Sequence, residues 1–85
     1  MDGQSKYPYL FLVDKPSVEA RREIARRLRE MGATVVAEYG DVAVEALVTA
    51  DQVEGARRIA ATTALRGPMA REHRERLTPQ ARRVV

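Results

Sequence analysis

The stretch from Ala33 to Val48, ATVVAEYGDVAVEALV, most strongly constrains what this chain can fold into. Two runs rich in β-branched residues flank Gly40-Asp41, which predicts a β-hairpin about a two-residue turn. In that register three cross-strand pairs share one face: Tyr39 with Val42, Ala37 with Val44, and Val35 with Ala46. This face is purely apolar, so we expect it to belong to the core.

The opposite face of the same hairpin is mixed in character. Its expected pairs are Thr34 with Leu47, Val36 with Glu45, and Glu38 with Ala43. Apolar residues framed by charges on a sheet are typical of a surface that binds another protein. The candidate partner-binding residues on this face are Val36, Glu38, Ala43, Glu45 and Leu47.

The segments around the hairpin predict the rest of the fold. Tyr9 to Val13 is a short apolar run with the length of a buried strand. Ser17 is a suitable N-cap for a helix that ends near Gly32, and Thr49 with Gln52 forms a capping box that opens a second helix. A final strand beside the first would complete a ferredoxin-like βαββαβ two-layer sandwich, an α+β fold with two helices on one face of an antiparallel sheet.

The C-terminal end allows two interpretations. Residues 62–70 could form the short last strand, or Pro68 could open a third helix, PMAREHRERL. We favour the strand, with a flexible N-terminus at residues 1–7, the ferredoxin-like domain at 8–71 and a basic tail at 72–85. The last twenty residues hold six arginines against two glutamates, so the net charge of +3 comes from this end.

The outer face of the first expected helix is rich in charge. Glu23 with Arg27 and Arg26 with Glu30 are spaced as i,i+4 ion pairs, each worth a few tenths of a kcal/mol. We interpret this face as a solvated helix surface.

Several classes of function are disfavoured. The chain has no cysteine, and its one histidine, His73, lies in a run of charges. It has no glycine-rich phosphate loop and no metal-ligand pattern, so we expect neither an enzyme nor a cofactor or metal site. Glutamates on the open sheet face would repel phosphate, which makes nucleic-acid binding by the sheet unfavourable. With no signal or transmembrane segment, a cytoplasmic location is expected if Met1 is the native start.

Five segments in order, YLFLV, SVEARREIARRLREMGA, VVAEY, VAVEALV and TADQV, carry a resemblance. Over residues 8–77 the chain is similar to the propeptides of subtilisin-like serine proteases and to the free-standing inhibitors related to them. The resemblance implies a ferredoxin-like fold with a tyrosine near the hairpin turn, as at Tyr39. It also implies that the open sheet face docks on two surface helices of the protease.

In that family the residues after the last strand run along the protease active-site cleft. The matching segment of this chain is Glu72, His73, Arg74, Glu75, Arg76, Leu77 and Thr78. Glu72 falls where the family places an acid that caps a protease helix, and Ala70 falls where a companion acid is usual. The cleft segment is mainly charged here, whereas the family usually offers apolar residues.

The resemblance implies a protease inhibitor or intramolecular chaperone whose partner is a subtilisin-like serine protease. Two alternatives stay open at this point. One is a ferredoxin-like regulatory or interaction domain that forms a homodimer through its sheet or binds a small ligand. The other is an RNA-associated protein that binds through its basic tail.

Overall fold

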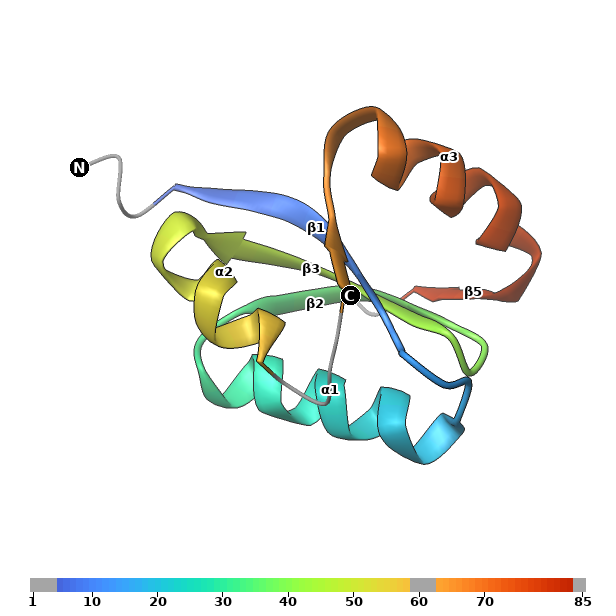
Figure 1. Ribbon diagram of the computed structural model, residues 1–85, viewed down its shortest axis with the longest axis horizontal. Coiled ribbons are helices and arrows are strands. Elements are labelled where there is room, and N and C mark those ends of the chain that lie inside the picture. The colour runs from blue at the N-terminus through green and yellow to red at the C-terminus, as the bar shows by residue number, and fades with distance from the viewer. Residues whose placement is uncertain (1–4, 59–62, 84–85) are drawn as a thin grey trace.

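The structure is a computed structural model that describes residues 5–58 and 63–83. An antiparallel sheet of order β4-β1-β3-β2-β5 carries α1 and α2 on one face and α3 on the other (Figure 1). In chain order the elements are β1 (Lys6–Leu12), α1 (Val18–Glu30), β2 (Thr34–Tyr39), β3 (Ala43–Thr49), α2 (Ala50–Arg57), β4 (Thr63–Leu65), α3 (Gly67–Leu77), the 3-10 helix η2 (Thr78–Gln80) and β5 (Ala81–Arg83). The first six elements confirm the predicted ferredoxin-like sandwich.

The helix ends follow the predicted caps. The Ser17 hydroxyl accepts a hydrogen bond from the Ala20 N–H at 3.2 Å, which satisfies a free donor of the first turn of α1. After α1, Gly32 has a φ of 93°, a value that side chains disfavour. Thr49 and Gln52 form the reciprocal capping box that begins α2.

The main core fills the space between the sheet and the first two helices. Phe11 from β1, Val44 and Val48 from β3, and Ile24 and Leu28 from α1 are all fully buried there. Burying a side chain of this size contributes about 1.5–3 kcal/mol. The helical spacing of Ala20, Ile24, Leu28 and Met31 predicts an apolar stripe on α1, and the structure confirms it at Ile24 and Leu28. In the second helix the spacing of Val53, Ala56 and Ala60 predicts an inner stripe; Ala56 is buried, and Ala60 lies outside the described residues.

The hairpin register differs from the prediction. Val35 opposes Ala46 and Thr34 opposes Leu47 as expected, but a β-bulge follows at Val36. Beyond the bulge the register is shifted: Ala37 opposes Glu45, Glu38 opposes Val44 and Tyr39 opposes Ala43. The turn has three residues, closed by a 3.0 Å hydrogen bond from the Val42 N–H to the Tyr39 carbonyl.

The bulge reverses which side chains face the main core. A one-residue slip sends every following side chain to the other face of a strand. The prediction that Ala37 and Tyr39 share the face of Val35 is therefore wrong. Both lie on the far side of the sheet, in a second buried cluster with Leu10 and Ala43.

The C-terminal segment contains both of the elements between which the sequence left a choice. β4 pairs with β1 at Leu10–Leu12, and α3 follows directly with Pro68 in its first turn. The predicted boundary after residue 71 falls inside α3. Residues 72–83 differ from an extended tail because α3 crosses the sheet and β5 pairs with β2 at its other edge.

Candidate protein-binding face of the sheet

The sheet face opposite α1 and α2 is the candidate site, and we call it the second face. It carries Leu10, Ala37, Tyr39 and Ala43, all buried, together with Glu45. Tyr39 and Leu10 are among the largest fully buried side chains of the protein. A compact apolar surface of this kind must be covered by something, and here α3 covers it (Figure 1).

Small residues let α3 lie close to the second face. Ala70 of α3 is fully buried against a cluster that includes Ala37 and Ala43. Leu77, two turns further on, is partly buried against the same cluster. The spacing of Ala70, Arg74 and Leu77 places these three side chains on one side of the helix.

A buried carboxylate lies beneath this helix. Glu45 is only 7% exposed, and its Oε1 accepts a 2.8 Å hydrogen bond from the Tyr39 hydroxyl. Arg74 brings its Nε within 2.9 Å of Glu45 Oε2, which forms an ion pair from α3 to β3. A buried carboxylate requires partners of this kind, because losing hydration without them costs several kcal/mol.

The predicted sheet-face residues fall into three groups. Ala43 and Glu45 lie on the second face beneath α3, and Leu47 lies on the same face, half-buried. Val36 occupies the bulge. Glu38 lies on the opposite face, where its Oε1 is 2.5 Å from Nη1 of Arg21 in α1, so its assignment to the docking face is corrected.

The second face extends beyond α3 at one end. Leu47 lies between Pro8 on β1 and Thr34 on β2, in one row across three strands. Lys6 donates hydrogen bonds to the Gly32 carbonyl at 2.8 Å and to the Thr34 hydroxyl at 3.3 Å. We call Lys6, Pro8, Thr34 and Leu47 the open end.

A hollow of about 420 Å³ adjoins the open end. Tyr7, Pro8, Arg66 and Gly67 line it where β4 gives way to α3. Tyr9, and to a lesser degree Tyr7, raise the pKa of the Arg66 guanidinium. The hollow thus combines aromatic surface with a positive charge beside the first turn of α3.

The predicted tail residues form most of α3. Glu72 to Leu77 are helical, and Thr78 opens η2 with its hydroxyl donating to the Arg74 carbonyl at 2.9 Å. Glu72, Glu75 and Arg76 are exposed, whereas His73, Arg74 and Leu77 are half-buried. Of the predicted tail residues, Arg74 pairs with the predicted sheet-face residue Glu45, and Leu77 packs against the cluster that contains Ala43.

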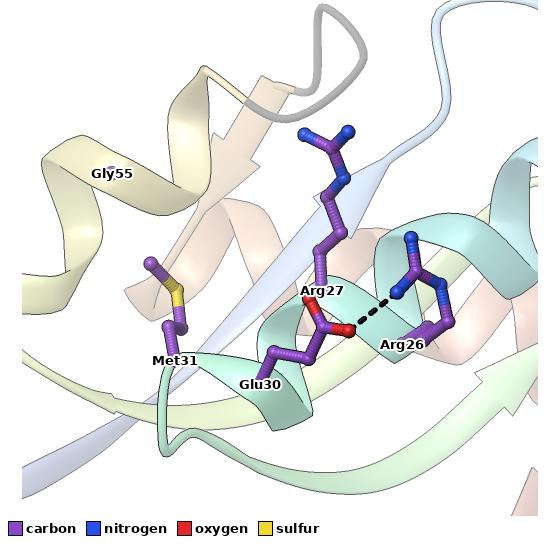
Figure 2. Close-up of a pocket in the computed structure, with 5 residues that line it drawn as sticks. All are labelled: Arg26, Arg27, Glu30, Met31 and Gly55. Carbon is purple, nitrogen blue, oxygen red and sulfur yellow. Dashed lines mark hydrogen bonds and ion pairs between the residues drawn. The ribbon is translucent and has the colours of Figure 1, made fainter.

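Another hollow, of about 420 Å³, lies between α1 and α2 (Figure 2). Arg26, Arg27 and Glu30 of α1, its C-cap Met31 and Gly55 of α2 line it. A β-carbon at Gly55 would lie 3.0 Å from the terminal methyl of Met31, so glycine allows the two helices to approach closely. This hollow is part of the contact between the two helices.

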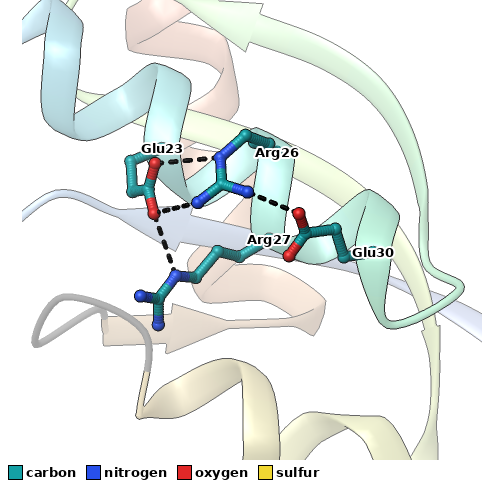
Figure 3. A network of polar contacts seen from close by, with 4 residues as sticks. All are labelled: Glu23, Arg26, Arg27 and Glu30. Carbon is teal, nitrogen blue, oxygen red and sulfur yellow. Dashed lines mark hydrogen bonds and ion pairs between the residues drawn. The ribbon is translucent and has the colours of Figure 1, made fainter.

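The charges beside that hollow are paired (Figure 3). Glu23 accepts hydrogen bonds from Arg26 at 2.5 and 3.1 Å and from Arg27 at 2.9 Å, while Arg26 also pairs with Glu30. Arg26, followed by Arg27, lowers the pKa of Glu23 from its ordinary value of 4.5. Both predicted i,i+4 pairs are confirmed, and these paired charges are typical of a solvated helix face.

No protein-family model, curated protein or solved structure matches this chain. Among residues 5–58 and 63–83, no three acidic or histidine side chains converge as metal ligands would. In the same part of the chain, none of the helices has the length and hydropathy needed to cross a bilayer. The second face is therefore the site from which we infer function.

Proposed function

We propose that this protein is a non-catalytic binding module whose second face receives a helix of a partner protein. The supporting observation is the packing of α3, in which Ala70 sits against Ala37 and Ala43 without exposed surface. A sheet face that carries small residues allows a helix to pack closely against it. A partner helix with small residues on one side would find the same complementarity.

The proposed partner is a subtilisin-like serine protease. The resemblance over residues 8–77 supports this choice, and so does the strand order β4-β1-β3-β2 of the described sheet. Related inhibitors dock on protease surface helices through this face. The protein would act by occlusion, as an inhibitor or as a chaperone for folding of the protease, with residues 72–78 reaching toward the cleft.

A homodimer through the sheet is less well supported. In such a dimer Val36 and Leu47 would meet their counterparts in the second copy, but Val36 occupies the bulge, and the neighbouring Ala43 and Glu45 lie beneath α3 within one chain. Only the open end of the second face remains for such a contact, and it is small. The cytoplasmic location stays a proposal that follows from the sequence, and fractionation of cells that express the full chain would test it.

Inhibition assays test the proposed function. The full chain is titrated against a panel of subtilisin-like proteases with a chromogenic peptide substrate. We expect tight inhibition of at least one member, with the protein surviving uncleaved for many turnovers. Failure to inhibit any member would overturn the proposed partner.

A pair of variants tests whether the second face makes the contact. Leu47→Lys places a charge at the open end, and Val18→Lys places the same charge at the start of α1, where Val18 is 43% exposed. We expect Leu47→Lys to weaken inhibition about tenfold or more, since it leaves a charge at an apolar contact. The Val18→Lys variant should inhibit as well as the parent, and equal losses in both variants would contradict docking through the second face.

A further inference from the structure

α3 contributes few large apolar side chains of its own to its contact with the sheet. Ala70 is the residue of α3 that is fully buried, and it has only a methyl side chain. Met69 beside it is 61% exposed, and no side chain caps the helix at its N-cap, Arg66. α3 thus contributes little apolar surface of its own to this contact, in which the larger side chains, Leu10 and Tyr39, belong to the sheet.

Among the residues that the structure describes, an ion pair joins α3 to the second face. Arg74 lies above Glu45, whose other oxygen is held by Tyr39. The Nε of Arg74 is buried, and its geometry toward the carboxylate is not that of a hydrogen bond. The ion pair therefore holds α3 on the sheet with moderate strength.

The segment that contains α3 begins at Gly67 and ends with the short edge strand β5. Gly67 joins β4 to α3 with a φ of 67°, and a β-carbon there would have no neighbour within 4 Å. At the far end β5 contributes a three-residue pairing with β2 at Ala37–Tyr39. Short edge pairings and lightly packed helices are the elements that open first in a folded domain.

We propose that residues 67–83 form a displaceable cover that competes with the partner's helix for the second face. This inference rests on the proposed function. The partner first contacts the open end at Leu47 and Pro8, beside the start of α3. The Arg74–Glu45 ion pair then breaks and α3 leaves the second face. Residues 72–78 become free to enter the active-site cleft of the protease. The cover keeps Leu10 and Tyr39 from water until a partner arrives.

Hydrogen exchange of the free protein tests the cover without any partner. We expect the amides of residues 71–77 to exchange through local opening, faster than the amides of β3, which open only with the whole domain. Arg74→Gln should accelerate exchange in residues 71–77 about tenfold or more, since it removes the cation that pairs with the buried Glu45 carboxylate. Exchange in β3 should change much less.

Arg76→Gln is the matched control, because Arg76 is an exposed arginine in the last turn of the same helix. It should leave the exchange of residues 71–77 unchanged within about twofold. Equal exchange rates in α3 and β3 of the parent protein would overturn the proposal. Equal effects of Arg74→Gln and Arg76→Gln would overturn it as well.

Binding kinetics provide the second test, with a protease that the full chain inhibits. Gly67→Ala strains the linker without altering the second face, because alanine disfavours a positive φ. Both Gly67→Ala and Arg74→Gln should raise the association rate several-fold, and slower or unchanged association in both would contradict the cover. Absence of inhibition would remove the proposed partner, yet the exchange measurement would still decide whether α3 opens.

Discussion

Arg21 of α1 and Glu38 of β2 form an ion pair between the helix layer and the sheet, with 2.5 Å between Nη1 and Oε1. Their side chains are 7% and 15% exposed, and Arg29 lies 3.7 Å from the other oxygen of Glu38. This contact exists because the bulge at Val36 turns Glu38 toward α1. It joins the helix layer to the part of the hairpin that lies beyond the bulge.

Removing one partner of this pair should be costly. We expect Arg21→Met to lower the free energy of unfolding by about 3 kcal/mol, since it leaves Glu38 nearly buried with only the more distant Arg29. Arg22→Met, at an exposed position of the same helix, should change stability by less than about 0.5 kcal/mol. Denaturant unfolding measures both, and similar losses would contradict the structural role of the pair.

Replacing both partners extends this test. The Nε of Arg21 is buried without a hydrogen-bond partner, so the ion pair is imperfectly satisfied. An apolar pair, Arg21→Met with Glu38→Leu, should therefore recover most of the stability lost by Arg21→Met alone. A double variant less stable than the single one would argue against this interpretation.

The parts of the fold that could be predicted are those that a strong local sequence pattern marks. Ser17, Gly32 and the Thr49–Gln52 box mark helix ends through local chemistry, and the structure confirms all three. The bulge could not be predicted in the same way. Val35 and Val36 are both valines, so the sequence does not mark which of them faces the core, and the slip after Val36 turns the charged Glu38 toward the helices.

The role of α3 depends on contacts that are distant in the sequence. Arg74 meets Glu45 only once the chain has crossed the sheet, and no local propensity encodes that meeting. The spacing of Ala70, Arg74 and Leu77 was the available signal, with one side of a helix presenting a methyl group, a cation and a leucine. Charged neighbours such as Glu72 and Arg76 obscured it.

Alanine substitutions should have opposite effects on stability at Gly32, which follows α1, and at Gly55, which lies in α2. Gly32→Ala should destabilise by about 1–2 kcal/mol, because its φ of 93° is strained for any side chain. Gly55→Ala should be neutral or stabilise by up to about 1 kcal/mol through helix propensity, as the Met31 methyl can move aside. Thermal unfolding of the two variants checks this, and a large loss at Gly55 would show that the α1–α2 contact is rigid.

The Glu23 network predicts a pH dependence. Because Arg26 and Arg27 lower the pKa of Glu23 in the folded state, its charge stabilises the protein above the ordinary value of 4.5. That contribution is lost as the pH falls through the lowered pKa. We expect Glu23→Gln to be slightly less stable than the parent at neutral pH and to converge with it in acid. Glu75→Gln, at an exposed position of α3, is the control. Its difference in stability from the parent should stay smaller over the same range of pH.

The close approach of α3 predicts a steric effect. Ala70→Leu should destabilise by about 1–3 kcal/mol, because no space remains between α3 and the second face. Met69→Leu changes an exposed residue beside it and should be almost neutral. Denaturant unfolding distinguishes the two, and an Ala70→Leu protein as stable as the parent would show that α3 is not closely packed.

Competition between α3 and a partner helix for the second face is the central claim, and hydrogen exchange in the complex measures it most directly. The full chain is compared alone and with a saturating amount of a subtilisin-like protease whose active-site cleft is filled by a covalently bound peptide inhibitor, so that residues 72–78 gain no protection there. We predict that the amides of residues 71–77 lose protection on binding, while those of β1 and β3 keep or gain it. Binding that leaves residues 71–77 as protected as before would contradict the claim.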